Sequence, residues 1–325
     1  MSTTSKSPRK VALGALAVGQ DALPAYSHRC SPKVYTQPQL FACLVLKEFF
    51  GTDYRGITAM LAEMPTLCEA LALPKVPHYT TLQKACRRLL RNAPVQRLLE
   101  STLLRARPRA KRRPRVKQAA LDSSGFEAHS TSHYFIRRRE KGGKRWQSTT
   151  YSRFPKLALL CDCANHLILA AMPMRGPGPD ITHFEPMLCQ AWPRAKIDTL
   201  LADAGYDAEW AHCVAREDLG IRTLIPAAIG RPTGKPPTGY YRRLMHSRLH
   251  LTGYGQRWQA ETTVSMIKRR LGPAVNARGY WSQCRALMLK AIPNILVLWC
   301  PLRGFLQSRS GSFVSMMLDA SGRRE

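Results

Sequence analysis

A short basic segment divides this chain into two parts whose hydrophobic patterns differ. Residues 105–117 contain eight Lys or Arg, two prolines and no acidic residue. Because such a segment repels itself and has few apolar side chains, we predict a linker there, either lying along phosphates or simply solvated. At 325 residues, the chain is also longer than the ~250–300 residues at which single hydrophobic cores usually stop growing. We therefore expect one folded part on each side of this linker.

The hydrophobic pattern before the linker indicates short helices. Apolar residues recur at three- and four-residue spacing from Leu40 to Val45, and Gly51 stands where that helix would end. A second helix is expected to begin at Tyr54, and a third is expected over residues 83–90. This part of the chain is therefore predicted to be all helical.

The helical domain is predicted to span residues 31–104. Residues 1–30, in which we find no periodicity, are predicted to form a mobile basic arm. The third helix carries Arg87 and Arg88, and Arg91 follows it, so the region favours a small helix-turn-helix-like DNA-binding unit. A helical dimerisation domain explains the pattern nearly as well, because no base-reading residue is identified.

After the linker the pattern changes to that of strands. Five apolar runs have the length of strands, and Ala164-Asn165, between the second and the third, is typical of a hairpin turn. The runs are residues 116–121, 157–163, 166–172, 197–202 and 223–226. Helical segments alternate with them over residues 183–192, 214–218 and 256–271. This order predicts a mixed α/β domain over 118–300, followed by a C-terminal tail over 301–325.

The net charge narrows the class of partner. Fifty Lys and Arg against 21 Asp and Glu leave a formal charge of +29, while 45% of the residues are hydrophobic, which is enough for a folded core. A surplus of one sign on this scale is self-repulsive unless a polyanion offsets it. Nucleic acid is therefore the expected partner, and a solvated basic surface is the plainer alternative.

Nothing in the sequence favours a membrane or an oxidising compartment. The longest apolar run near the C-terminus, Ile292–Trp299, contains Pro293 and Asn294 and is far shorter than the roughly 20 residues of a membrane span. The ten cysteines show no C-x-x-C spacing, so we predict reduced thiols rather than disulfides or a zinc site. Cys161 and Cys163 should share one face of a strand as small core residues. We expect a cytoplasmic protein.

Three acidic residues are candidates for catalysis because of where they lie. Asp122 and Asp203 each end a predicted strand, and the small residues after them would let a phosphate backbone approach. Glu261 lies in the predicted helix over 256–271, on one polar stripe with Arg257 and Lys268. Taken singly, each Asp is more often a turn or cap residue, and an Arg–Glu–Lys ladder is often only a solvated surface.

The helical stripe belongs to a longer signature. The spacing Tyr-x2-Arg-x3-Glu-x6-Lys is met by Tyr254, Arg257, Glu261 and Lys268. On these residues the sequence resembles the DDE transposases of bacterial and archaeal insertion sequences, in the branch that this signature marks. Residues 121–125 around Asp122 and residues 202–207 around Asp203 match the two other blocks of the family. Ala204 stands where the family more often has a basic residue.

The resemblance implies a fold and an active site. The fold would be a ribonuclease H-like mixed sheet flanked by helices and preceded by the small helical domain. Asp122, Asp203 and Glu261 would be the catalytic residues and would bind two Mg²⁺ or Mn²⁺ ions, held ~3.5–4 Å apart by carboxylate oxygens. Contacts to DNA near the scissile end would come from Tyr254, Arg257 and Lys268. No ATP-type phosphate-binding motif is present, so no nucleotide cofactor is implied.

The function implied is that of a DNA transposase, a divalent-metal-dependent polynucleotidyl transferase and endonuclease. It would bind the ends of its insertion sequence, cleave them and transfer the 3′-hydroxyl into target DNA. Its partners would be double-stranded DNA, as terminal inverted repeats and as target, and further copies of itself in a homo-oligomer that holds two ends together. We expect it in the prokaryotic cytoplasm, associated with the nucleoid. The alternatives are a catalytically inactive DNA-binding relic that competes with active enzyme, and a structure-specific nuclease of the same fold.

Overall fold

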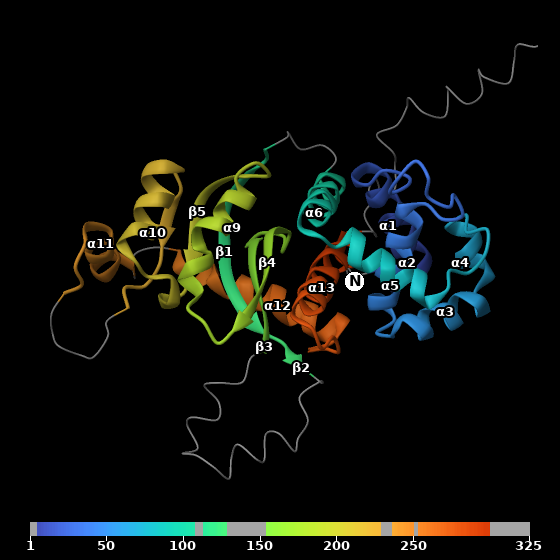
Figure 1. Ribbon diagram of the computed structural model, residues 1–325. Coiled ribbons are helices and arrows are strands. Elements are labelled where there is room, and N and C mark those ends of the chain that lie inside the picture. The colour runs from blue at the N-terminus through green and yellow to red at the C-terminus, as the bar shows by residue number, and fades with distance from the viewer. Residues whose placement is uncertain (1–4, 108–112, 129–153, 229–235, 250–252, 300–325) are drawn as a thin grey trace, which may run out of the picture.

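The computed structural model describes residues 5–107, 113–128, 154–228, 236–249 and 253–299 (Figure 1). The predicted linker lies partly outside these residues, and the predicted tail over 301–325 lies wholly outside them. Helices occupy the first part of the chain, and the three predicted from periodicity are confirmed as the second, third and fifth. These helices are α1 (Pro8–Ala22), α2 (Gln37–Phe49), α3 (Tyr54–Glu63), α4 (Pro65–Ala70), α5 (Tyr79–Leu89) and α6 (Asn92–Ala106).

Helix α1 lies where a mobile arm was expected. The side chain of Ser7 caps it by accepting a hydrogen bond from the backbone N–H of Lys10 at 3.3 Å. Val11, Ala15 and Val18 are fully buried, and the helix packs on α2 and α6. Their spacing of four and three residues is helical, but the small and apolar residues between them hide that period in the sequence. The prediction of a mobile arm is therefore wrong for residues 8–22.

A five-stranded mixed sheet forms the second part, as the sequence predicted. The central strand pairs antiparallel with one neighbour and parallel with the other, and the strand order is β4-β3-β1-β5-β6. The strands are β1 (Arg115–Gly125), β3 (Phe154–Asp162), β4 (Ile168–Gly176), β5 (Lys196–Ala202) and β6 (Arg222–Leu224). The predicted hairpin is confirmed as the β3–β4 pair. A separate parallel pair joins β2 (Glu127–Ala128) to β7 (Ala274–Val275).

Helices cover the sheet. They are α9 (Phe184–Ala191), α10 (Glu209–Cys213), continued by a π-helical turn (Val214–Asp218), α11 (Tyr240–Arg248), α12 (Trp258–Leu271) and α13 (Tyr280–Trp299). Short 3₁₀ turns lie at Asp180–His183, Ala204–Tyr206 and Tyr254–Arg257. Helix α12 packs on β1 and β3, whereas α9 and α13 pack on β3 and β4. In the part of the chain that is described, no helix is long and apolar enough to span a membrane.

Residues on the two faces of the sheet belong to different apolar clusters. Ala119 and Leu121 of β1 belong to the larger one, which extends through α13 into helices α1–α6. Ala120 between them belongs to the smaller one, with Cys161 and Cys163 of the β3 region, so these two cysteines share a face as predicted. The smaller cluster also contains Leu201 of β5, Leu224 of β6, Met245 of α11 and Ala260 of α12.

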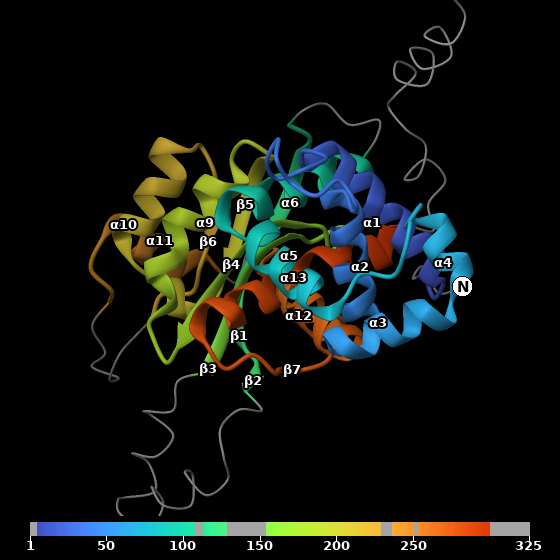
Figure 2. The same cartoon turned by 45° about the vertical axis from the view of Figure 1, so that its right-hand side comes forward.

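Helix α13 connects the two parts of the molecule. It packs against α1, α2, α5 and α6 on one side and against β3 and β4 on the other (Figures 1 and 2). Leu287, Ile292 and Ile295 are fully buried there. From the sequence, only Ile292–Trp299 of this segment was noted, as an apolar run too short to span a membrane. Because α13 shares its apolar residues with both parts, the helices before the linker and the sheet have one continuous core.

Candidate active site

Asp122 and Asp203 lie side by side at the edge between two parallel strands. Strands β1 and β5 pair in parallel up to Leu121 opposite Ala202, and each Asp is the next residue. Neighbouring strands in a sheet run ~4.8 Å apart, so this register places the two carboxylates on adjacent chains. Asp122 is not at the end of its strand as predicted, because β1 continues beside β3 as far as Gly125. It lies where β1 stops pairing with β5.

Helix α12 lies over the face of β1 that carries Asp122. Side chains alternate along a strand, so Ala120, Asp122 and Ser124 share one face. Ala120 packs in one cluster with Ala260 of α12. The Lys268 ammonium donates to the Ser124 hydroxyl oxygen at 2.8 Å and lies 5.1 Å from the centre of the Phe126 ring. These contacts fix the middle of α12 against β1.

The chain just before α12 is fixed to the neighbouring strand. The Tyr254 hydroxyl donates to the backbone oxygen of Ala202 at 3.1 Å, directly before Asp203. The Asp203 carboxylate accepts a hydrogen bond from the backbone N–H of Gly205 at 2.9 Å and so caps the following 3₁₀ turn. Tyr254 thus contacts β5 just before Asp203, and Lys268 contacts β1 just after Asp122.

Glu261 is ion-paired with Arg257 one turn earlier in the chain. Its side chain is 55% exposed. Asp203, Glu261 and Arg257 all act electrostatically on the Asp122 carboxyl group, so the fold brings these four charged side chains into one neighbourhood. Within the described residues, however, no three His, Cys, Asp or Glu side chains are already arranged as a metal-binding group.

The electrostatics of this neighbourhood are unfavourable for a carboxylate. The pKa of Asp122 is raised from 3.8 to about 6, chiefly because the group is buried. The negative charges of Asp203 and Glu261 raise this pKa, whereas the Ser123 N–H, which donates to Asp122 at 2.8 Å, and the Arg257 guanidinium lower it. A half-buried carboxylate next to like charges is stabilised by any added cation.

The chemistry of these donors fits a hard divalent cation. Three carboxylates supply the anionic oxygen ligands that Mg²⁺ and Mn²⁺ prefer, and a bound cation would oppose the burial and the two neighbouring negative charges that raise the pKa of Asp122. In the structure Arg257 supplies a positive charge there by pairing with Glu261. For Glu261 to join a metal site with both Asp residues, its carboxylate would have to move from the position it has in the structure.

The raised pKa of Asp122 predicts a pH-dependent stability in the metal-free protein. Because the folded state binds this proton more tightly than the unfolded state, ionisation of Asp122 destabilises the fold as the pH rises through about 6. Asp122→Asn removes that charge and should raise the free energy of unfolding near neutral pH by about 2 kcal/mol. The gain should shrink as the pH falls from about 6 to 4, where wild-type Asp122 is protonated.

Urea unfolding in EDTA across this pH range measures the effect. The control is Asp218→Asn, which removes an exposed carboxylate and should shift stability by less than about 0.5 kcal/mol. If Asp122→Asn destabilises the protein at neutral pH, or if its gain does not depend on pH, the electrostatic description of Asp122 is wrong.

Two groups near the acids were not identified from the sequence. Ser124 accepts the Lys268 hydrogen bond, and its position two residues after Asp122, on the same strand face, was a signal that could have found it. Tyr206 is fully buried, and Asp122 and Asp203 raise the pKa of its hydroxyl further beyond the effect of burial. Asp207 follows Tyr206 and holds α11 in place, because it accepts from Arg242 at 2.9 Å and from the Ala228 N–H at 2.7 Å.

Comparison with known families gives a match over the region that contains these acids. A family model described as a transposase DDE domain matches residues 117–293, more than half of the chain. The match begins in β1 and ends within α13, so it includes both Asp residues, Glu261 and the rest of α12. No curated protein matches the chain.

Proposed function

The chain belongs to the transposase DDE domain family, and we propose on that basis that it binds the ends of an insertion sequence, cleaves them and joins the 3′-hydroxyls to target DNA. Family membership makes it a polynucleotidyl transferase or endonuclease with DNA as substrate. The mixed sheet flanked by helices fits a ribonuclease H-like transposase domain. The finer assignment, to the branch with the Tyr-x2-Arg-x3-Glu-x6-Lys signature, is part of the proposal.

One observation carries the proposal for the active site. Asp122 and Asp203 are adjacent across the β1–β5 register, and α12 brings Glu261 into the same electrostatic neighbourhood. DDE transposases generally use divalent metal ions. Mg²⁺ or Mn²⁺, as a pair held by these three carboxylates, would lower the pKa of an attacking water or 3′-hydroxyl and stabilise charge on the leaving oxygen.

The neighbouring residues would position the DNA. Arg257 can bind a phosphate through two parallel N–H···O bonds, and in doing so it would release Glu261 from the ion pair. Lys268, held by Ser124 at the strand face, would place a positive charge beside the scissile phosphate. Tyr254 would keep the start of the helix against β5 and present its ring to the DNA end. Helices α1–α6 would hold a more distant part of the DNA, and two copies of the chain would hold two ends.

Strand joining by the purified full-length chain tests this proposal. The substrate is a pre-cut duplex end, its sequence taken from the DNA flanking the gene, with a supercoiled plasmid as target. The proposal predicts joined products with Mn²⁺ or Mg²⁺ and none with EDTA.

The two alternatives give different results in the same assay. An inactive relic would shift the duplex in a gel without altering either strand. A structure-specific nuclease would cut with metal and never join. Either outcome would overturn the assignment as an active transposase.

A further inference from the structure

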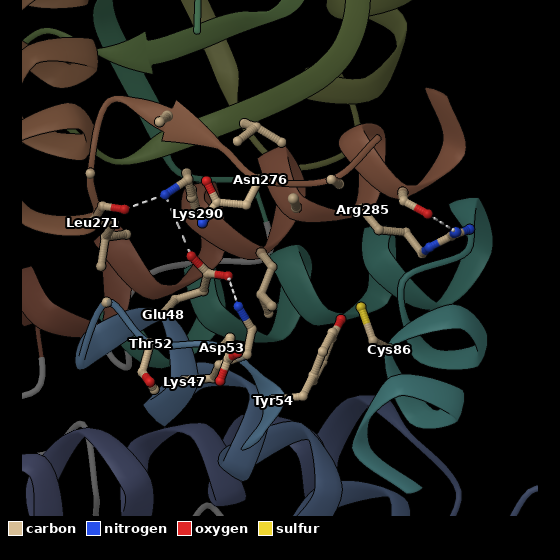
Figure 3. A pocket seen from close by; sticks show the side chains of 18 of the residues that line it. Lys47, Glu48, Thr52, Asp53, Tyr54, Cys86, Leu271, Asn276, Arg285 and Lys290 are labelled. Carbon is tan, nitrogen blue, oxygen red and sulfur yellow. Dashed lines mark hydrogen bonds and ion pairs between the residues drawn. The ribbon is translucent and has the colours of Figure 1, made fainter. Parts of the chain in front are cut away.

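A cleft on the other side of α12 from the acids is lined by residues from both parts of the chain. Its volume is about 710 Å³, and its walls come from α2, α3 and α5 on one side and from the end of α12, β7 and the start of α13 on the other. Figure 3 shows Lys47, Glu48 and Tyr54 on one wall facing Arg285 and Lys290 on the other. The cleft therefore lies where the N-terminal helices meet the catalytic part.

Positive side chains dominate this cleft. Six cationic residues line it against two acidic ones, Glu48 and Asp53. The cations are Lys47, Arg87, Arg270, Arg278, Arg285 and Lys290. We call this the interdomain basic cleft.

Both acids of the cleft are already engaged within the protein. Glu48 is buried and pairs with Lys47 at 2.5 Å and with Lys290 at 3.5 Å (Figure 3). Asp53 caps α3 by accepting from the backbone N–H of Gly56 at 2.7 Å. Among the described residues, neither carboxylate pairs with any of the four arginines of the cleft.

The four arginines of the cleft have no carboxylate within 4.0 Å in the part of the chain that the structure describes. Arg270 donates only weakly, to the side-chain oxygen of Asn294 at 3.4 Å, and Arg285 donates to the Ser282 hydroxyl at 3.1 Å. Burial and the adjacent Arg269 lower the pKa of Arg270. Concentrated positive charge in a partly enclosed cleft, where the arginines donate only to neutral acceptors, is stabilised by an anion.

The size and shape of the cleft favour a ligand with several linked anionic groups over a single small anion. A cavity of this volume could hold a drug-sized molecule, far more than one phosphate group. Arg87 projects from α5 on one wall, while Arg278 precedes α13 on the other, and both are exposed. Arginines on opposite walls can contact successive phosphates of one strand, because each guanidinium binds two oxygens at once.

We propose that the interdomain basic cleft binds the phosphate backbone of duplex DNA, as a contact separate from the three acids. The inference rests on the proposed function only in taking DNA as the ligand. Arg270 follows Glu261 by nine residues on α12, which is a rise of about 14 Å and a half-turn to the opposite face of the helix. The DNA segment in the cleft is therefore a different one from the segment at the acids, and the cleft holds the chain on DNA at a distance from the cut.

Chemical protection of the wild-type chain tests the cleft directly. Phenylglyoxal modifies accessible arginines, and mass spectrometry of the digested protein reads each site. A duplex several helical turns long should protect Arg87 and Arg278 several-fold. The comparison arms are inorganic phosphate and polyglutamate at equal anion concentration. Protection by either comparison anion that equals or exceeds protection by DNA would overturn the proposal in favour of a small-anion or an acidic-peptide site. Absence of protection by DNA would also overturn it.

A pair of variants tests the same contact through salt dependence. Arg87→Gln with Arg278→Gln removes one exposed cation from each wall, so folding should be little affected. Each lost phosphate contact should reduce the slope of log affinity against log salt by about 1, so the double variant should lose about 2. The charge-matched control is Arg243→Gln with Arg248→Gln on α11, at the far end of the molecule from α1–α6 in Figure 1.

The control pair should leave the protection of Arg87 and Arg278 by DNA unchanged. If the cleft variants bind DNA with the wild-type slope, the proposal fails. This outcome is distinct from failure of the proposed function, because binding is read without any strand chemistry. If the protein joins strands while DNA leaves its cleft arginines unprotected, only the proposal for the cleft is wrong. If DNA protects the cleft arginines but no strands are joined, only the assignment as an active transposase is wrong.

Discussion

Asp122→Asn, Asp203→Asn and Glu261→Gln should each reduce strand joining by at least about 10³-fold, equivalent to roughly 4 kcal/mol of transition-state stabilisation. Each change keeps the shape of the side chain and removes the negative charge that is proposed to bind the metal ions. The two Asp residues are adjacent across the β1–β5 register, so the loss of either leaves the other unable to hold a pair of ions alone. Joining is measured on the pre-cut duplex with Mn²⁺.

The control for these variants separates chemistry from folding and binding. Asp218→Asn removes an exposed carboxylate outside the site and should join strands at the wild-type rate. Duplex binding by the three site variants should be retained, because the basic residues proposed to contact phosphates are unchanged. Any one site variant that still joins strands at more than about a tenth of the wild-type rate removes its residue from the catalytic assignment.

Glu48→Gln should lower the free energy of unfolding by about 3 kcal/mol. Lys290 is 5% exposed and Glu48 is 7% exposed, and burial lowers the pKa of Lys290 while the Glu48 carboxylate offsets part of that effect. The Lys290 ammonium also donates to the backbone oxygen of Leu271, the last residue of α12. Without the Glu48 charge, a buried ammonium is left with a carbonyl oxygen as its remaining partner among these contacts. Urea unfolding at neutral pH measures the loss.

A second variant and a surface control show whether the lost stability comes from the unpaired buried charge. Adding Lys290→Met to Glu48→Gln removes the unpaired charge, so the double variant should be more stable than Glu48→Gln alone. Asp198→Asn breaks the exposed pair with Arg115, whose side chain is 74% exposed, and should cost less than about 1 kcal/mol. If Glu48→Gln costs no more than Asp198→Asn, the buried network does not stabilise the junction of the two parts.

Local patterns predicted the strands well, because the buried strands are short and nearly continuously apolar. The hairpin of β3 and β4 follows from one turn between two such runs. The same nearly continuous run of apolar residues is why helices α1 and α13 were missed. In both, apolar residues fill the positions between the buried ones, so no polar face marks a helical period, and α13 also contains Pro293. The positions of these two helices depend on the core that they share with distant parts of the chain, and a short stretch of sequence does not reveal those contacts.

The candidate site could be predicted only in its parts. Local motifs pointed to Asp122, Asp203 and Glu261, but the register that puts the two Asp residues on adjacent strands is a long-range pairing. Periodicity could not decide whether Arg257 and Glu261 form a surface ion pair or part of a site, because the four-residue spacing between them is compatible with either. The interdomain basic cleft was invisible in sequence, because its six cations come from segments nearly two hundred residues apart.

Counting bound Mn²⁺ by electron paramagnetic resonance, on the full chain bound to a pre-cut DNA end, tests the central claim most directly. The account predicts two ions per chain whose spectra show coupling between neighbouring ions, and loss of that coupled signal in each of Asp122→Asn, Asp203→Asn and Glu261→Gln. A wild-type complex without coupled Mn²⁺, or a coupled signal that survives all three substitutions, would contradict it.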